Sequence, residues 1–251
     1  MTPLQMAAVA AAGFAAGGIN TIVGSGSLIT FPTLLALGLP PVQANVTNTI
    51  GLVPGSISGT IGYRRELRGQ QGRTLRLGVA AISGGVLGAV LLLALPSSTF
   101  EKAIPFLVLV AVVLTALQPR LARRLDGRRA RGTDGPLLTA AVCATSVYGG
   151  YFGAGQGVIL LALMGAFVSE HLQRLNAVKN VLTVLVNGAA AVVFVVAAHV
   201  RWPVAGVLAL GAVAGGQAGA ALGRRLPRNA LRATIIVVGL IVSVKLFLDA
   251  F

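Results

Sequence analysis

Two glycine-rich stretches interrupt the apolar sequence and could build a binding site for an anion. The first is Gly24-Ser25-Gly26-Ser27, and the second is Gly153-Ala154-Gly155-Gln156-Gly157. A helix that begins after such a break presents free backbone N–H groups and the positive end of its dipole. Two such helix ends, approaching from opposite sides, would attract an anion, and Ser25, Ser27 and Gln156 would add side-chain donors. The alternative is that these glycines only allow close helix packing.

A second set of polar side chains opens two long apolar segments farther along the chain. The members are Asn45, Thr47 and Asn48 in the first half and Asn176, Lys179 and Asn180 in the second. Lys179 is the one basic residue that lies well inside an apolar run, away from loops and segment ends. An ionisable group inside a membrane segment is a functional candidate, so Lys179 could neutralise a bound anion. Alternatively, its flexible stem carries the charge to the membrane interface.

The composition shows what kind of protein must position these residues. Hydrophobic residues make up 55% of the 251 residues and charged residues only 10%, whereas a soluble domain carries about 25% charged residues. The apolar runs are unbroken, unlike the alternating strands of a membrane β-barrel. The sequence therefore predicts an all-α integral membrane protein in the cell membrane with several passes, and excludes a soluble enzyme.

The apolar segments number ten, five on each side of an arginine-rich stretch. Their expected ranges are 4–23, 27–39, 42–62, 74–95 and 100–118, then 136–152, 156–168, 173–198, 203–223 and 229–250. Segments 27–39 and 156–168 hold thirteen residues each and directly follow the two glycine-rich stretches. At about 1.5 Å per residue, such helices are too short for a bilayer core of roughly 30 Å. We expect glycine-broken short helices or re-entrant hairpins at both places.

An internal repeat relates the two halves. Residues 77–96 align without gaps to 208–227, and both stretches contain Gly-Gly-x-x-Gly-Ala followed by Leu-Pro. We therefore expect a first transmembrane repeat at 1–118, a basic cytoplasmic linker at 119–135 and a second, inverted repeat at 136–251.

The distribution of arginines over the loops predicts that the second repeat has the opposite orientation in the membrane to the first. The net charge is +14, and the basic residues gather in short loops around 64–73, 119–135 and 224–228, which are expected on the cytoplasmic side. The turn at 96–99 would then face outward, although its repeat equivalent, 224–228, would face inward. Inverted repeats with paired, glycine-interrupted short segments are typical of secondary transporters. No aromatic residues accompany the arginines for stacking on bases, so no nucleic acid partner is expected.

The positions of the remaining ionisable residues limit the functions that the protein could have. All six acidic residues lie in predicted loops or at segment ends, and the two histidines lie near segment ends. No carboxylate stands in mid-membrane to bind a cation or to act as an acid or base. The sequence therefore predicts no metal site, no cofactor and no enzymatic activity.

The chain resembles the TauE/SafE family of sulfite exporters. The resemblance rests on the stretch from Gly24 to Pro32, on Gly38-Leu-Pro-Pro41 followed by residues 44–48, on 176–180 and on the Gly215 to Pro227 ending, and it covers essentially the whole chain. Ser27 stands where the commoner form of the first motif has a glycine. The resemblance implies a secondary transporter or exporter of a small sulfur-containing anion, such as sulfite or an organosulfonate. A passive anion channel on the same scaffold is the alternative, and the oligomeric state stays open.

Overall fold

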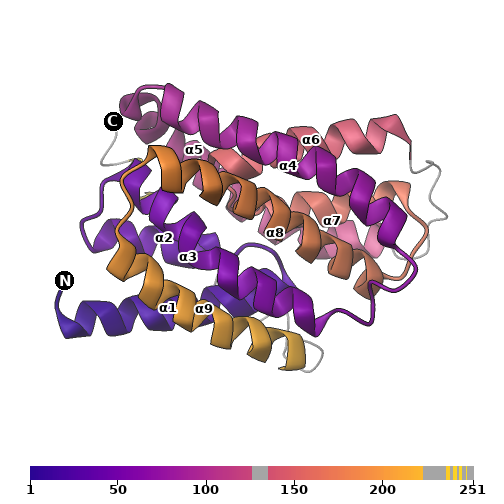
Figure 1. Ribbon diagram of the computed structural model, residues 1–251, viewed down its shortest axis with the longest axis horizontal. Helices are drawn as coiled ribbons and strands as arrows, with labels where there is room; N and C mark the ends of the chain where they lie inside the picture. The colour runs from indigo at the N-terminus through magenta and orange to yellow at the C-terminus, as the bar shows by residue number, and fades with distance from the viewer. Residues whose placement is uncertain (126–134, 223–235, 238–239, 242, 245–246, 248–251) are drawn as a thin grey trace.

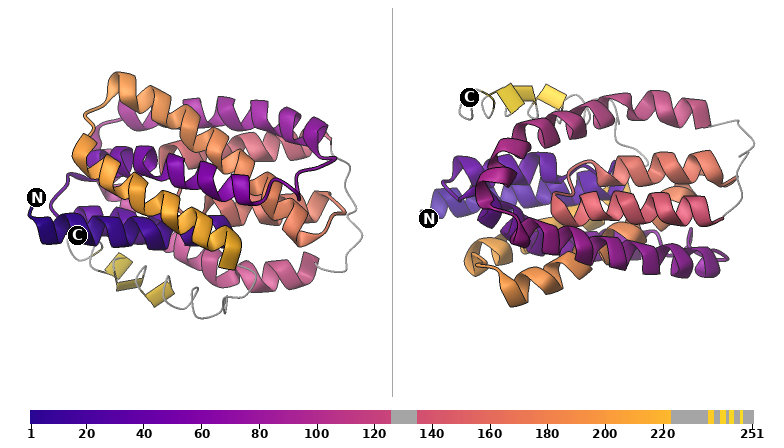
Figure 2. Two further views of the ribbon diagram at one scale, coloured as in Figure 1. Left: turned by 60° about the horizontal axis from the view of Figure 1, so that its bottom comes forward. Right: turned by 90° about the horizontal axis from the view of Figure 1, so that it is seen from above.

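The computed structural model describes residues 1–125 and 135–222, together with positions 236, 237, 240, 241, 243, 244 and 247. Nine helices lie within the first two of these ranges and no strand does. They are α1 (Pro3–Ile22), α2 (Ser27–Ala36), α3 (Pro41–Gly62), α4 (Gln71–Ala94), α5 (Ser97–Leu125), α6 (Pro136–Tyr151), α7 (Gln156–Phe167), α8 (Leu172–Ala197) and α9 (Trp202–Leu222). The long helices run roughly along the longest axis of the molecule (Figures 1 and 2).

Local sequence explains where several helices begin. Proline occupies the first turn of α1, α3 and α6, where its fixed φ suits a helix and its missing N–H costs no hydrogen bond. At the start of α1, Thr2 and Gln5 also form a capping box, in which each side chain binds the other residue's backbone N–H. The expected apolar segments thus correspond to real helices, with ends that shift by a few residues.

Two helical hairpins occupy the places where the glycine-rich stretches predicted broken helices. α1 leads through a first break, residues 23–26, into the ten-residue α2, and α6 leads through a second break, residues 152–155, into the twelve-residue α7. The α1–α2 hairpin lies towards the end of the molecule that holds the N-terminus, whereas α7 and the start of α6 lie towards the opposite end (Figure 1). The two hairpins therefore point towards each other along the long axis.

Helices α4 and α9 each pack on the other half of the chain. α4 contacts α6 and α8, and α9 contacts α1 and α3. Glycines at matched repeat positions make these contacts close: a Cβ on Gly84 would clash with the backbone oxygen of Cys143, and one on Gly215 would clash with that of Phe14. Gly88 and Gly219 are a second matched pair against α6 and α1. Small residues of this kind are what lets membrane helices approach closely.

The surface of these helices fits a bilayer. Within the described part of the chain, five helices are long and apolar enough to cross a membrane, namely α1, α4, α8, α9 and the part of α5 from Ser97 to Leu117. Large apolar side chains are exposed on them, including Val196, Leu210 and Leu75. The chain is therefore an all-α, multi-pass integral membrane protein, as the composition predicted.

Parts of the predicted organisation fall outside the described residues. They are positions 126–134 of the linker, the arginines between 224 and 232, and most of the expected last segment, 229–250. α5 continues to Leu125, so the stretch expected to be linker begins as helix. Without the last segment the two five-segment halves cannot be compared in full, and the inverted repeat stays a prediction.

Candidate functional site

The two glycine breaks meet inside the protein. Gly24 has φ +91°, and a Cβ built on it would lie 2.7 Å from the Cα of Gly157. A Cβ on Gly157 would lie 2.7 Å from the Cα of Gly24 in return. Only glycine combines the left-handed backbone at position 24 with such a close approach. The hairpins from the two halves therefore touch backbone to backbone, and we call this crossing the tip contact.

Buried polar groups without partners lie beside the tip contact. Ser25 is 1% exposed and Gln156 is 2% exposed. The hydroxyl of Ser25 and both polar atoms of the Gln156 amide make no hydrogen bond within the described chain. Buried polar groups are nearly always hydrogen-bonded in proteins, so these atoms are available to a polar partner.

Polar residues of α8 hold the carbonyl end of α1. The amide nitrogens of Asn176 and Asn180 donate to the backbone oxygen of Thr21 at 3.2 and 3.4 Å. Lys179 Nζ donates to the backbone oxygen of Asn20 at 3.0 Å. The last carbonyls of a helix have no partner within the helix, so α8 satisfies those that the first break leaves open.

A polar residue of α3 likewise binds a backbone carbonyl at the second break. Asn45 Nδ2 donates to the backbone oxygen of Tyr151, the last residue of α6, at 2.9 Å. Thus Asn45 of the first half caps the second break, while Asn176 of the second half caps the first. This exchange ties one predicted site residue of each half to the break of the other half.

The remaining predicted residues of α3 divide between two places. Asn48 donates to Ser27 Oγ at 3.3 Å and accepts a hydrogen bond from the hydroxyl of Thr30, so it ties α3 to the start of α2. Thr47 instead accepts from the backbone N–H of Arg201, in the connection between α8 and α9, at 3.3 Å. Thr47 is next to Asn48 in sequence but points about 100° away around the helix, so it does not face the breaks with Asn48.

Two residues that complete the breaks were not singled out from the sequence. Asn20 Oδ1 accepts from the backbone N–H of Gly26 at 2.8 Å, so its side chain already satisfies one donor at the start of α2. In the second break, the Tyr148 hydroxyl donates to the backbone oxygen of Ala154 at 2.6 Å. The sequence signal for Asn20 was a lone amide side chain in the last turn of an apolar segment.

Lys179 has no exposed surface, and it is the only buried Lys, Arg, Asp or Glu of the described residues. Its side chain points to the end of α1 rather than to the membrane interface. No described carboxylate lies within salt-bridge distance of it, and its only partner there is a neutral carbonyl. A buried charge without an opposite charge is costly.

Other unsatisfied polar atoms lie on the same helices. Asn45 Oδ1, Asn176 Oδ1 and the Thr183 hydroxyl are buried without a hydrogen-bond partner in the described structure. Within the described residues, no group of three His, Cys, Asp or Glu side chains could hold a metal ion. What the arrangement offers is a buried lysine side chain, hydroxyls and amides around two broken helices.

Comparison with known proteins gives a consistent match over nearly the whole chain. The family model described as "Sulfite exporter TauE/SafE" matches residues 9–246. "Probable membrane transporter protein YfcA" of Escherichia coli (strain K12) is 28% identical, over 100% of this chain and 92% of its own length. "Probable membrane transporter protein ORF9" of Sinorhizobium sp is 27% identical, over 95% of this chain and 90% of its own length. No solved structure matches.

Proposed function

The chain belongs to the TauE/SafE family of membrane transporters, and from this premise we propose that it carries a small sulfur-containing anion, sulfite or an organosulfonate. The site would lie at the tip contact, between the two glycine breaks. The residues that would bind or shape it are Gly24, Ser25, Gly26, Ser27, Asn45, Asn48, Gly153, Gly155, Gln156, Asn176, Lys179 and Asn180.

The burial of Lys179 carries this proposal. An ammonium group has three N–H donors, and within the described chain only one has an acceptor, Asn20 O. An oxyanion beside Lys179 would supply the missing opposite charge and accept the remaining hydrogens. A cation at the same place would meet an unscreened positive charge instead, because the interior screens charges poorly.

The neighbouring donors suit the oxygens of such an anion. The Ser25 hydroxyl and the Gln156 amide nitrogen are unpartnered and lie at the starts of α2 and α7. Both helix starts carry the positive end of a helix dipole. An anion with three oxygens has enough acceptors for Lys179 and for one donor from each hairpin.

Binding of candidate anions to the purified protein tests the proposal. Sulfite, sulfate, thiosulfate, taurine and sulfoacetate should be titrated in turn by isothermal calorimetry, with chloride and ammonium as controls. We expect saturable binding of one of the sulfur anions and none of ammonium. If none of the five binds the folded wild type, the proposed substrate class is wrong.

Flux measurements then separate the transporter from the passive channel. In proteoliposomes a transporter should give uptake that saturates with anion concentration, because each cycle requires binding and rearrangement of the hairpins. A channel on the same site would give flux that rises in proportion to concentration well above the dissociation constant.

A further inference from the structure

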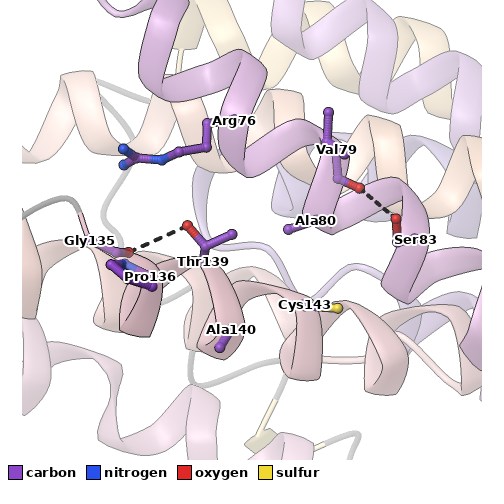
Figure 3. A pocket seen from close by; sticks show the side chains of 9 residues that line it. All are labelled: Arg76, Val79, Ala80, Ser83, Gly135, Pro136, Thr139, Ala140 and Cys143. Atoms are coloured by element: carbon purple, nitrogen blue, oxygen red, sulfur yellow. Dashed lines mark hydrogen bonds between the residues drawn. The ribbon is translucent and has the colours of Figure 1, made fainter.

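An open groove lies between the first halves of α4 and α6. Its volume is about 820 Å³, and it is lined by Arg76, Val79, Ala80 and Ser83 of α4 and by Gly135, Pro136, Thr139, Ala140 and Cys143 (Figure 3). This size falls in the range of roughly 300–1,000 Å³ found for small-molecule sites. None of its lining residues belongs to the transport site proposed above.

Helix packing explains why the groove exists. α4 and α6 approach backbone to backbone where Gly84 meets Cys143 and where Gly88 meets Val147. Towards the start of both helices the glycines are replaced by larger residues, and the helices no longer touch so closely. The groove is the space between the two helices, alongside the part of α6 from Cys143 back to Pro136 (Figure 3).

The lining of the groove is apolar along its length and has a cationic side chain, Arg76, at one end. The hydroxyls of Ser83 and Thr139 each donate to the backbone oxygen four residues earlier in the chain, Val79 O at 3.0 Å and Gly135 O at 3.4 Å. They are thus occupied within the protein. Arg76 lies at the same end of the groove as Gly135 and Pro136 (Figure 3), and no described residue pairs with its guanidinium group.

The surroundings of the groove indicate its occupant. The groove opens beside the apolar surface of α4, where Leu75 is 74% exposed and Val79 is 61% exposed. Such a surface on a membrane-spanning helix contacts lipid, so acyl chains rather than water are available to fill the groove. Arg76 lies in the second turn of α4, directly after the loop with exposed Arg64, Arg65 and Arg68. Basic pockets between membrane helices at the cytoplasmic side bind anionic lipid head groups.

We propose that this groove binds one anionic phospholipid, with the phosphate on Arg76 and an acyl chain along Val79, Ala80 and Ala140. The lipid would act as a wedge between α4 and α6 where glycine packing ends. Because α6 is the first arm of the second hairpin, the lipid would fix the base of that hairpin while its tip remains in contact with Gly24.

Native mass spectrometry of the detergent-purified full chain tests this site. Phosphatidylglycerol and phosphatidylcholine with identical acyl chains are added at equal concentrations. We expect wild type to retain one phosphatidylglycerol in preference to phosphatidylcholine. Arg76→Gln should reduce this preference about tenfold, since a charge-assisted hydrogen bond is lost. The matched control Arg64→Gln removes a charge at the same end of the molecule but outside the groove, and should keep the preference.

Two further measurements distinguish other occupants. Ala140→Trp should fill the groove and block lipid retention, and inorganic phosphate should not displace the lipid. Equal retention of the two lipids by wild type, or an unchanged preference in folded Arg76→Gln, would overturn the proposal. Displacement by inorganic phosphate would show a free-anion site instead. A wild-type dimer that Ala140→Trp dissociates would identify the groove as a subunit interface.

Discussion

Lys179 Nζ lies 3.0 Å from the backbone oxygen of Asn20, so the buried ammonium group of the second half holds the carbonyl end of a helix from the first half. That helix end carries a partial negative charge, which compensates the ammonium group only in part. A bound anion would share Lys179 with Asn20. Under the proposed function, this one side chain would link anion binding to the position of the first hairpin.

Replacing Lys179 should weaken anion binding without unfolding the protein. Lys179→Met keeps the volume but removes the charge. It leaves Asn20 O without its donor, at a cost of about 1–3 kcal/mol, and it also removes the cost of burying an unpaired charge, so the two effects on stability oppose each other. Loss of the charge contact should cost about 1.5–3 kcal/mol of binding free energy, or roughly ten- to hundredfold in affinity. Calorimetric titration of the bound anion measures this change. Exposed Lys102→Met on α5 is the control, and an unchanged dissociation constant in folded Lys179→Met would contradict the role.

Adding a methyl group at the tip contact should destabilise the protein. Gly24→Ala places a Cβ at positive φ and 2.7 Å from Gly157 Cα, and strained backbone of this kind costs about 1–3 kcal/mol even without the clash. Gly188→Ala on α8 is the matched control, because no atom lies within 4 Å of its added Cβ. Thermal unfolding in detergent should show a lower Tm for Gly24→Ala and for Gly157→Ala only. Equal Tm values in all three variants would mean that the hairpins do not meet.

The two asparagines that cap opposite hairpins should differ in their importance for stability. Asn45→Ala leaves Tyr151 O without its donor, and Asn176→Ala removes one of the two donors to Thr21 O. A buried group left unsatisfied costs about 1–3 kcal/mol. Asn45→Ala should therefore lower the free energy of unfolding more than Asn176→Ala, since Asn180 still serves Thr21. Gln43→Ala, whose contact to His199 O is exposed and long at 3.4 Å, serves as the control. The reverse order of the two asparagine variants would contradict the capping assignment.

Cysteine labelling should locate the basic loops on the cytoplasmic side. Cys143 is the single cysteine of the chain, so Cys143→Ala provides a cysteine-free background. Arg65→Cys and Gly127→Cys should resist a membrane-impermeant maleimide in intact cells, whereas Ser98→Cys should react, because positive loops stay inside. Labelling of Arg65→Cys from outside would reverse the predicted orientation.

Anion export should follow the membrane potential. No described carboxylate lies buried in a membrane span to carry a coupling ion, and a negative interior favours anion exit by about 2.3 kcal/mol per charge per 100 mV. Flux from proteoliposomes under an imposed potential, with equal pH and sodium on both sides, measures this drive. A divalent anion that ignores the potential but follows a sodium or proton gradient would reveal a coupling site.

Several features of this protein follow from the sequence alone because they depend on short stretches of chain. Continuous apolar runs define membrane helices without reference to any neighbour. The glycine-rich stretches end those helices locally, so the short helices after Gly26 and Gly155 could be placed to within a few residues. The motif residues from Gly24 to Pro32 and around Lys179 were enough to suggest the family, which the match over residues 9–246 confirms.

Which groups meet was decided only by the tertiary structure. The sequence places Asn45 and Asn176 near the starts of two long apolar segments, one in each half, yet each caps a helix of the opposite half, more than a hundred positions away. Thr47 shares its helix with Asn48 but faces the connection between α8 and α9. The role of Asn20 is visible only in the tertiary structure, where its backbone oxygen accepts a hydrogen bond from Lys179. Periodicity tells which residues share a face, but not which helix that face will meet. That choice depends on backbone contacts such as the one between Gly24 and Gly157, because only packing of distant segments brings two glycines to one point.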